Sequence, residues 1–452
     1  MMNSAEIALQ ARQDTAFLGH PKGLFFLAFT EAWERFSFYG MTALVVLYMV
    51  NQLLLPGHLG HIAGMDGFRA AIESIFGPLS TQALASEIYG LYSAFVYFTP
   101  LLGGIVADRW IGQRNAVVIG ALLMCGGHLA MAFDQTFLAA LLLLVLGSGF
   151  LKGNISAQVG ALYPPDAEAR RAHGFIIFST GINIGAVLGP LLCGLLAQVY
   201  GWHVGFGAAA VFMLLGLVTY LYGYRSLPAR VARNLRQTVD LTARDWRRIR
   251  ALVTVIVLSI LPSVAFYQVT NVAPVWTQQH VASHIGALLI PVPWYLSINS
   301  LFSILGVPLL LSIWRQQAAR GGEPDEIAKI GIGALLIGAS NLFLVAASLL
   351  SRAGLVNPIW PFLYSAGLGI GFLYYWPPLL SLVSRAAPAR VNATMMGFVF
   401  VSLFVANNLI GWLGGFYEPM GPLGFWFMHV VIGTAGGLLT LVVGRRLSRT
   451  GW

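Results

Sequence analysis

Long apolar segments follow one another along almost the whole chain, and they restrict its possible folds more than any other feature. A helix that crosses a bilayer needs about 20 predominantly apolar residues. Twelve segments meet this requirement, with expected ranges of 24–50, 85–107, 114–134, 137–159, 172–198, 202–224, 249–276, 291–316, 326–351, 357–384, 391–416 and 421–445. Charged residues make up only 10% of the chain, against about 25% in soluble domains. The sequence therefore predicts an all-α membrane protein with twelve transmembrane helices.

The lysines and arginines lie mainly in alternate connections between these predicted helices. The N-terminus, the even-numbered connections and the C-terminus hold most of them, whereas the odd-numbered connections hold only Arg69 and Arg352. By the positive-inside rule, both termini are expected on the cytoplasmic side of a multi-pass protein of the cell (inner) membrane. Because the net charge of +9 belongs largely to these loops, it gives no reason to expect a nucleic acid as a partner.

The longest basic connection, residues 225–248, divides the predicted helices into six and six. We interpret it as a cytoplasmic linker between two six-helix bundles, residues 1–224 and residues 249–452. Two halves of this kind suit an alternating-access transporter, whose binding site lies near the membrane midplane between them.

Three charged residues stand in the middle of the first predicted helix. Glu31, Glu34 and Arg35 are spaced i, i+3 and i+4, so they share one face of the helix. Charges at this depth are costly and usually functional. A carboxylate beside an arginine can change its protonation state when its surroundings change, which is what coupling a proton to a substrate requires. A buried ion cluster that only holds helices together is the alternative interpretation.

A single lysine, Lys152, lies well inside a span, the fourth. A buried lysine needs an anion, and Glu31 and Glu34 are the intramembrane anions available, so we expect Lys152 to pair with them. Snorkelling of its side chain to the inner surface is the alternative. In the fifth helix, Asn183 lies between small residues and could bond across helices or line a cavity.

The segment from Gly103 to Arg114 joins the second and third predicted helices. Its glycines allow close helix packing, and Asp108 and Arg109 can pair with helix ends at the cytoplasmic mouth. We expect Asp108 to be a gate or structural charge. The segment resembles the loop signature of the major facilitator superfamily.

Several separated motifs together resemble the proton-dependent oligopeptide transporter family of that superfamily. They are Glu31-x-x-Glu34-Arg35-Phe36-Ser37-x-Tyr39-Gly40-Met41, Gly103 to Gly112, the stretch from Phe175 to Gly185, Trp294-x-x-x-x-Asn299 and Ala387-Pro388-Ala389-Arg390. The resemblance covers nearly the whole chain. It implies a major facilitator fold that imports di- and tripeptides together with protons, without a cofactor or metal ion and without enzymatic activity. We expect a monomer in the lipid bilayer.

The resemblance also implies roles for individual residues. Glu31 and Glu34 would bind and couple protons, and Arg35 would hold the peptide carboxylate with Lys152 and Tyr39 nearby. Through its pairing with the glutamates, we expect Lys152 to take part in proton coupling as well. Further substrate-binding residues would be Tyr97, Asn183, Gln268 and Asn299.

Several positions depart from the family pattern. The tenth-helix glutamate that usually receives the peptide amine falls at Phe372, and the following Ser-Pro becomes Trp376-Pro377. The fifth-helix tyrosine falls at Ser179, and one tyrosine of the first-helix motif is Phe38. The extra helix pair between the bundles is missing. The carboxylate end of the site is thus retained, whereas the amine end has lost its charge. Cation–π contacts of about 0.5–2 kcal/mol with the aromatic run Tyr374, Tyr375 and Trp376 would partly replace it. Ordinary helix packing of these rings is the alternative.

Other function classes remain open at this stage. A proton symporter of another small anionic or carboxylate solute would need only the cationic half of the site. A membrane enzyme is disfavoured because the sequence has no paired metal-ligand spacing and no nucleophile elbow. A channel is disfavoured because the predicted helices carry no ring of charge.

Overall fold

The computed structural model describes residues 14–164, 166–228, 241–388 and 390–449. Half of the predicted linker lies outside the described residues, because 229–240 are not among them, and so does Ala389 of the Ala-Pro-Ala-Arg motif. The N-terminal arginine Arg12, which contributes to the predicted orientation, also falls outside.

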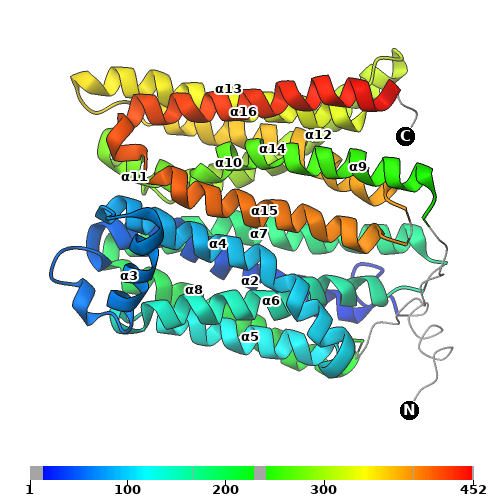
Figure 1. The fold of residues 1–452 in the computed structure, drawn as a ribbon. Helices are drawn as coiled ribbons and strands as arrows, with labels where there is room; N and C mark the ends of the chain where they lie inside the picture. The colour runs from blue at the N-terminus through cyan, green and yellow to red at the C-terminus, as the bar shows by residue number, and fades with distance from the viewer. Residues whose placement is uncertain (1–13, 165, 229–240, 389, 450–452) are drawn as a thin grey trace. The chain divides into compact units, whose positions relative to one another are not determined.

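Long helices make up nearly all of the described structure (Figure 1). The α-helices are α2 (Lys22–Tyr48), α3 (Met65–Phe76), α4 (Thr81–Val106), α5 (Gln113–Ala130), α6 (Phe137–Ala161), α7 (Glu168–Tyr200), α8 (Trp202–Gly223), α9 (Ala243–Leu258), α10 (Ile260–Tyr267), α11 (Val272–His280), α12 (Trp294–Ala319), α13 (Glu326–Leu350), α14 (Ile359–Ala386), α15 (Asn392–Gly414) and α16 (Tyr417–Arg449).

Short elements connect or extend these helices. Among them are η1 (Met49–Leu53), η2 (Leu59–His61), η3 (Ala107–Ile111), η4 (Asp134–Thr136), η5 (Tyr224–Ser226), η6 (Gln268–Thr270) and η7 (Ser351–Ala353). The strands β1 (His284–Ile285) and β2 (Leu288–Leu289) pair antiparallel, with His284 opposite Leu289. They form a small hairpin in the connection between α11 and α12.

Within the described residues, eleven helical segments are long and apolar enough to cross a membrane. They correspond to eleven of the twelve predicted spans. The remaining predicted span is the third, 114–134. It corresponds to α5, whose first turn carries the polar residues Gln113, Arg114 and Asn115. α5 packs closely on α6. The glycines allow this approach, since a Cβ at Gly120 would lie only 2.7 Å from the carbonyl oxygen of Gly147.

The predicted seventh helix, 249–276, is broken into shorter pieces. α9 ends at Leu258, α10 covers only 260–267, and η6 leads to α11. Pro262 and Pro274 lie in the first turns of α10 and α11, where the missing proline N–H leaves no bond unmade. Asn271, with φ −106° and ψ −86°, separates η6 from α11. The two prolines therefore favour new helix starts over one continuous helix.

The chain forms two compact units. Unit 1 comprises Met1–Val45, Pro56–Phe68 and Phe95–Asn234, and unit 2 comprises Val46–Leu55, Arg69–Ala94 and Leu235–Trp452. The first half of α4 thus groups with the later helices. The division into bundles at 225–248 stays a prediction.

In unit 1, α2 packs against α7 and α8 along its length. A Cβ at Gly181 of α7 would lie 2.7 Å from the carbonyl oxygen of Ala28, so the glycine lets the two backbones approach. On the α8 side, the Ser37 hydroxyl donates to the carbonyl of Ala209 at 2.7 Å, and Phe36 packs on Phe212 with ring centroids 4.1 Å apart. These contacts determine which face of α2 is left for its charged residues.

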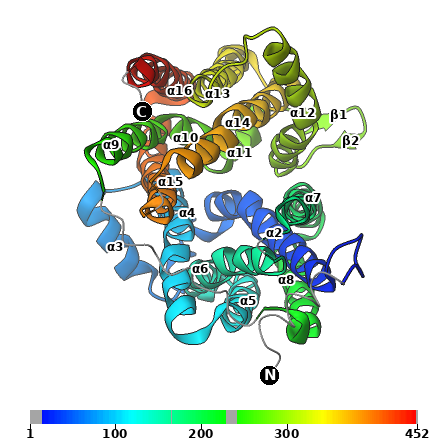
Figure 2. The same cartoon turned by 90° about the vertical axis from the view of Figure 1, so that its right-hand side faces the viewer.

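In unit 2, α13 packs against both α14 and α16, as Figure 2 shows. Glycines again allow close approach: a Cβ at Gly333 would lie 2.6 Å from the backbone nitrogen of Tyr375, and one at Gly338 would lie 2.8 Å from that of Thr434. Trp276 and Trp426 are fully buried in this unit. The core of unit 2 therefore combines backbone contacts with large aromatic side chains.

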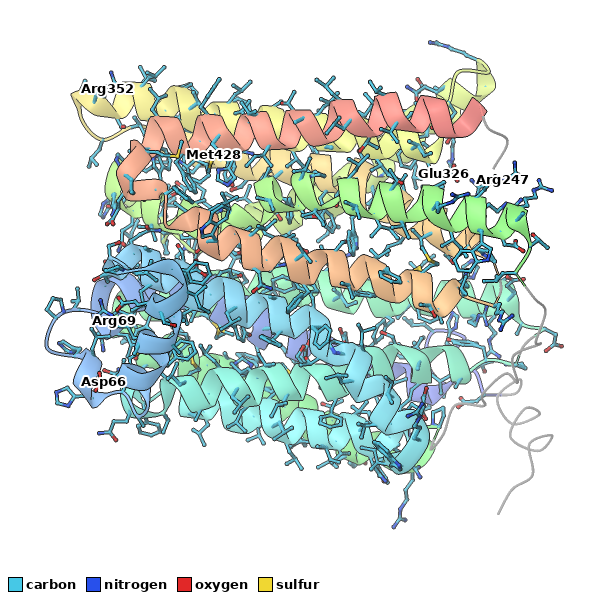
Figure 3. All side chains as sticks on the ribbon, viewed as in Figure 1. Asp66, Arg69, Arg247, Glu326, Arg352 and Met428 are labelled. Atoms are coloured by element: carbon cyan, nitrogen blue, oxygen red, sulfur yellow. The ribbon has the colours of Figure 1, made fainter. Side chains whose placement is uncertain are left out.

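Three arginines of unit 2 lie as the alternate-connection pattern predicts. Arg69 and Arg352, the two assigned to odd-numbered connections, lie at one end of the helices (Figure 3). Arg247 lies at the opposite end, together with Glu326. Which end faces the cytoplasm remains a prediction from the positive-inside rule.

Candidate functional site

The charged residues of α2 form one cluster. The Nε atom of Arg35 lies 3.1 Å from Glu31 Oε1, and it also donates to Glu34 Oε2. Glu31 is 4% exposed, Glu34 is fully buried and Arg35 is 7% exposed. One turn further along, Tyr39 is close enough to interact electrostatically with the Arg35 guanidinium. The i, i+3, i+4 spacing thus brings these groups together as the sequence predicts.

Each member of the cluster keeps one buried polar atom without a hydrogen-bond partner among the described residues: Glu31 Oε2, Glu34 Oε1 and Arg35 Nη2. Unsatisfied buried polar atoms are costly, and charged ones especially so. Both carboxylates engage the Nε edge of Arg35, so its Nη2 donor remains available. The cluster can accept a proton on a carboxylate and an anionic group on the guanidinium.

Helix α7 holds the arginine in place. A Cβ at Gly185 would lie 2.8 Å from the Cβ of Arg35 and 2.7 Å from the backbone nitrogen of Phe36. Any larger residue at this position would push α2 away. The glycines of the fifth-helix signature therefore position the charged face of α2.

Lys152 does not form the ion pair that we expected from the sequence. Among the described residues it has no ion pair with Glu31 or Glu34; instead its Nζ atom lies 4.2 Å from the ring centroid of Phe38 and 5.6 Å from that of Tyr97. The physical reason is that Arg35 already neutralises the two carboxylates through one oxygen of each, and the aromatic faces of Phe38 and Tyr97 offer the Lys152 cation another favourable environment.

Phe38 is a site residue to which sequence reasoning assigned no role. Its ring lies near two cations, because the Cζ atom of Arg35 is 5.1 Å from its centroid, slightly farther than the Lys152 nitrogen. It is 8% exposed. The contact of Phe38 with Arg35 could have been predicted, because the two residues are three apart on the same helix face. The contact of Phe38 with Lys152 on α6 could not, because it depends on how the two helices pack.

Asn183 stands apart from the cluster. It lies on α7 between Gly181 and Gly185, two residues from each, which places it on the side of α7 opposite those glycines. Among the described residues it makes no hydrogen bond with the charged cluster. Its predicted contact with substrate stays a prediction.

Unit 2 contains the remaining predicted binding residues, two of which are engaged in helix packing. Gln268 is fully buried in η6, donates to the carbonyl of Ile410 at 3.4 Å and keeps a buried Oε1 atom without a partner among the described residues. Asn299 of α12 donates to the carbonyl of Ser365 on α14 at 3.3 Å. Both amides therefore connect helices of this unit, and their contact with a substrate stays a prediction.

Phe372 and Trp376 belong to an aromatic stack. Phe372 stacks on Phe266 of α10 with ring centroids 5.2 Å apart, and on Trp376 with centroids 6.3 Å apart. Phe372, where the resemblance places the family's tenth-helix glutamate, is thus the middle ring of a three-ring column; its contact with a substrate stays a prediction. Phe266 was not singled out from the sequence, because only the packing of α10 on α14 brings it there.

Asp108 and Arg109 lie in η3, and both are exposed. Asp108 Oδ1 accepts a hydrogen bond of 2.7 Å from Gln113 Nε2 at the start of α5. Gly112, with φ +77°, makes the turn between them, a conformation that favours glycine. Asp108 thus orders this connection, and its role as a gate stays a prediction.

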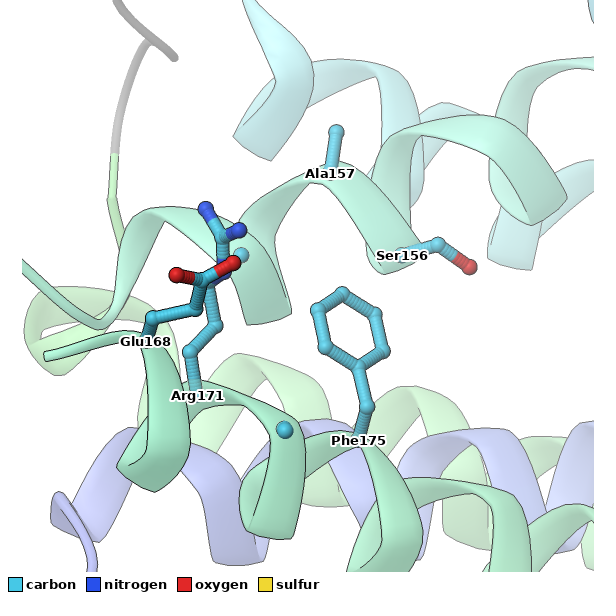
Figure 4. A pocket seen from close by; sticks show the side chains of 7 residues that line it. Ser156, Ala157, Glu168, Arg171 and Phe175 are labelled. Atoms are coloured by element: carbon cyan, nitrogen blue, oxygen red, sulfur yellow. The ribbon is translucent and has the colours of Figure 1, made fainter. Parts of the chain in front are cut away.

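A separate hollow lies between the end of α6 and the start of α7 (Figure 4). Its volume is about 480 Å³, and its lining consists of Ser156, Ala157, Gly160, Glu168, Arg171, Ala172 and Phe175. None of the predicted site residues lines it. The charged groups at its rim are exposed, so the hollow is part of the surface of unit 1.

Apolar helices that enclose a charged cluster on α2 are typical of a polytopic membrane protein with a functional site inside the membrane. The family model described as Major Facilitator Superfamily matches residues 24–411, and the chain therefore belongs to that superfamily. This confirms the major facilitator fold expected from the loop signature.

Similar proteins are peptide transporters, which confirms the resemblance to the oligopeptide transporter family. A di-/tripeptide transporter of Lactococcus lactis subsp. cremoris is 27% identical, over 96% of this chain and 97% of the relative. Peptide transporter YePEPT of Yersinia enterocolitica is 29% identical, over 88% of each. A crystal structure of a mutant peptide transporter POT in complex with alafosfalin superimposes with a TM-score of 0.87, at 29% identity and 99% coverage of both chains.

Proposed function

We propose that the protein is a proton-coupled symporter that imports di- and tripeptides by alternating access, with altered recognition of the peptide amino terminus. The observation that carries the proposal is the buried Arg35, whose Nε atom is held by Glu31 and Glu34 while its Nη2 atom has no partner among the described residues. The similar di-/tripeptide and peptide transporters support peptides as the substrate class. The bilayer orientation with both termini in the cytoplasm, and a monomeric state, belong to the same proposal.

Charge balance explains how the cluster would couple the two solutes. With all groups ionised, two carboxylates offset the two cations Arg35 and Lys152. A peptide carboxylate on Arg35 adds one negative charge, and a proton on Glu31 or Glu34 removes one. The site that holds both the peptide and the proton is then as close to neutral as the empty site. Closing the two bundles around the site in a low-dielectric environment therefore costs less free energy with both solutes bound than with only one of them.

Release would reverse these contacts. When the site opens to the cytoplasm and the proton leaves, a carboxylate regains its charge. Lys152, which now lies over Phe38 and Tyr97, could then pair with that carboxylate. The pairing would compete with the peptide for the cationic side of the cluster and favour its exit.

The amine end of the site would use aromatic faces in place of a carboxylate. Phe266, Phe372 and Trp376 form a stacked column, and the resemblance places the family's glutamate at Phe372. Helices α10, α12, α14 and α15 contain no acidic residue. A cation–π contact contributes about 0.5–2 kcal/mol, which is less than a buried ion pair, so selectivity for a free amine should be weak.

A second candidate function follows from the absence of acidic residues in α10, α12, α14 and α15. A symporter of another small anionic or carboxylate solute would need the cations of α2 and α6 and would have no use for an acidic amine-binding group. The aromatic column of Phe372 would then contact an apolar part of that solute.

Uptake of labelled dialanine into proteoliposomes distinguishes these two functions. We expect accumulation under an inward proton gradient, loss of accumulation without the gradient, and weaker competition by N-acetylated dialanine than by free dialanine. No peptide uptake, or equal competition by the acetylated peptide, would favour the anionic-solute symporter. An empty-vector protein preparation in matched vesicles serves as the control.

A further inference from the structure

The membrane-spanning segments contain one more buried carboxylate, which is far from the α2 cluster in sequence. Glu87 lies in the first half of α4 and is 7% exposed. Among the described residues no lysine, arginine or histidine forms an ion pair with it. The sequence did not single it out, because it is only the third residue of the span predicted at 85–107.

Glu87 lies at a tight contact between α4 and α15, both of which belong to unit 2 at this point. A Cβ at Gly411 would lie 3.1 Å from Glu87 Oε2. One turn along α4, a Cβ at Gly90 would lie 2.6 Å from the Cα of Gly411 and 2.7 Å from the carbonyl oxygen of Asn407. The two backbones therefore touch beside the carboxyl group.

Further polar contacts extend the same interface on either side. The Ser93 hydroxyl donates to Asn407 Oδ1 at 2.8 Å. At the other end, a Cβ at Gly414 would meet Ser86 Cβ at 2.6 Å and Asn271 Nδ2 at 3.1 Å. Glu87 is thus enclosed by a close-packed contact that offers small and neutral groups, and no cation.

The titratable groups on the elements around Glu87 do not supply a counter-charge. α15 has no charged or titratable side chain. α4 carries Tyr89 and Tyr92 within the next two turns. His280 at the end of α11 is engaged by the carbonyl of Trp276, and Tyr417 and Glu418 begin α16.

An ionised carboxylate without a counter-ion is strongly disfavoured in such surroundings, whereas the neutral carboxyl group is tolerated. The closed contact between α4 and α15 therefore disfavours the ionised form of Glu87, and ionisation of Glu87 disfavours the closed contact. In the predicted division into two six-span bundles, α4 belongs to the first bundle and α15 to the second. Alternating access between such bundles would separate this contact when the site opens to the outside.

We propose that Glu87 is a second proton-binding residue, which exchanges protons with the outer solution and permits closure of the α4–α15 contact only when it is protonated. This inference rests on the proposed function for the direction of transport. During import, a proton from the outer solution would neutralise Glu87. The neutral carboxyl group would then favour closure of the α4–α15 contact over a loaded site. The same proton returns to the outer solution when the contact opens, so Glu87 adds nothing to the number of protons carried across.

The test measures the contact itself. Ser93→Cys and Asn407→Cys place two thiols at the interface, in a protein whose native cysteines, Cys125 and Cys193, are replaced by alanine. A short bifunctional thiol reagent then reports closure in proteoliposomes at equal pH on both sides. Because thiol reactivity itself rises with pH, Glu87→Gln in the same background is the reference at each pH.

We expect the cross-linking yield, relative to the Glu87→Gln protein, to be about 1 near pH 5 and to fall at least about threefold near pH 8, as the carboxyl group ionises. Glu87→Asp should keep this pH dependence, and Ser86→Ala, which changes a neighbouring residue, should leave it unchanged. A constant ratio across this range would overturn the role of Glu87.

Dialanine uptake in the same vesicles separates the two proposals. We expect Glu87→Gln to retain peptide exchange and proton-driven accumulation. At a constant pH difference across the membrane, its initial uptake rate should lose the dependence on outer pH that the protein with Glu87 shows. Absence of proton-driven uptake in the protein with Glu87 intact would contradict the proposed function, and with it the part that Glu87 plays in import. Unchanged pH dependence of uptake in Glu87→Gln would contradict the inference about Glu87 alone.

Discussion

The ammonium group of Lys152 lies 4.2 Å from the ring centroid of Phe38, although two buried carboxylates stand on the same helix as that ring. The cation on α6 thus rests on an aromatic face of α2. Arg35, whose Cζ atom is 5.1 Å from the same centroid, holds the carboxylates. This division of partners keeps Lys152 available for the step in which a carboxylate loses its proton.

The first prediction concerns the aromatic face. We expect Phe38→Leu, which keeps an apolar side chain, to weaken dialanine binding by about 2- to 30-fold. Without the ring, Lys152 loses a cation–π contact of roughly 0.5–2 kcal/mol and pairs more readily with the carboxylates, where it competes with the peptide. Binding to the purified protein by calorimetry measures the effect. Phe38→Tyr retains the ring and should bind within about twofold of the unchanged protein. Equal losses in both variants would mean that the ring acts only through its shape.

Lys152→Ala should abolish accumulation of dialanine against its gradient while leaving exchange of internal for external peptide. The reason is that exchange needs no proton release, whereas net import needs a cation to take the place of the departing proton. Uptake and counterflow in the same proteoliposomes measure the two processes. Lys22→Ala, at an exposed lysine, is the matched control. Full proton-driven accumulation in Lys152→Ala would contradict the coupling scheme.

Arg35→Lys keeps the positive charge but removes the planar fork of donors. We expect dialanine affinity to fall by about 10- to 100-fold, in line with roughly 1.5–3 kcal/mol for a hydrogen bond to a charged group. Arg352→Lys, at an exposed arginine, should leave affinity unchanged. An unaltered affinity in Arg35→Lys would place the peptide carboxylate elsewhere.

Phe372→Glu should increase discrimination between free and N-acetylated dialanine by at least about tenfold, because an ion pair with the free amine replaces a weaker cation–π contact. Competition of both peptides against labelled dialanine gives the ratio. Phe372→Gln, which has nearly the same shape and no charge, separates the electrostatic effect from disruption of the stack on Phe266. If the ratio stays the same in Phe372→Glu, the substrate amine does not reach this position.

A last prediction concerns stability outside the membrane-spanning segments. Burial, together with the nearby Arg170 and His173, lowers the pKa of His20 below its ordinary value of 6.5. Its Nδ1 atom lies 2.9 Å from the hydroxyl of Tyr163, whose pKa burial raises to about 12. Between the lowered and the ordinary pKa, the unfolded chain binds more protons at this site than the folded protein, so stability decreases as the pH falls through 6.5.

Thermal unfolding of the detergent-solubilised protein at about pH 7.5 and about pH 5.5 checks this expectation. His20→Asn keeps a polar side chain that does not titrate, and it should reduce the difference in Tm between the two pH values. An equal difference in both proteins would show that other groups cause the acid sensitivity. Tyr163→Phe removes the hydroxyl partner and should lower Tm at both pH values.

Much of the fold follows from local features of the sequence. Apolar length predicts the spans, because a backbone in lipid must satisfy its own hydrogen bonds within each helix. Prolines at 262 and 274 favour interruptions in the seventh span, which was predicted as continuous, but Pro190 and Pro308 lie inside continuous helices, so proline alone does not predict a break. The contact between Glu31 and Arg35 was also predictable, because residues four apart are always neighbours on a helix.

Contacts between helices could not be predicted in this way. The position of Lys152 over Phe38 depends on the rotation and depth of α6 against α2, and the column of Phe266 on Phe372 depends on how α10 packs against α14. Glu87 has no unusual neighbour along the chain, and only the close approach of Gly90 to Gly411 makes it a buried carboxylate without a counter-ion.

By itself, then, the sequence determined the membrane spans, the superfamily and the charged face of α2, because apolar length and helix periodicity act over a few residues. The tertiary structure alone decided the partners of Lys152, Phe372 and Glu87, because these depend on the distances at which glycine-rich helix surfaces pack, which no short stretch of sequence contains.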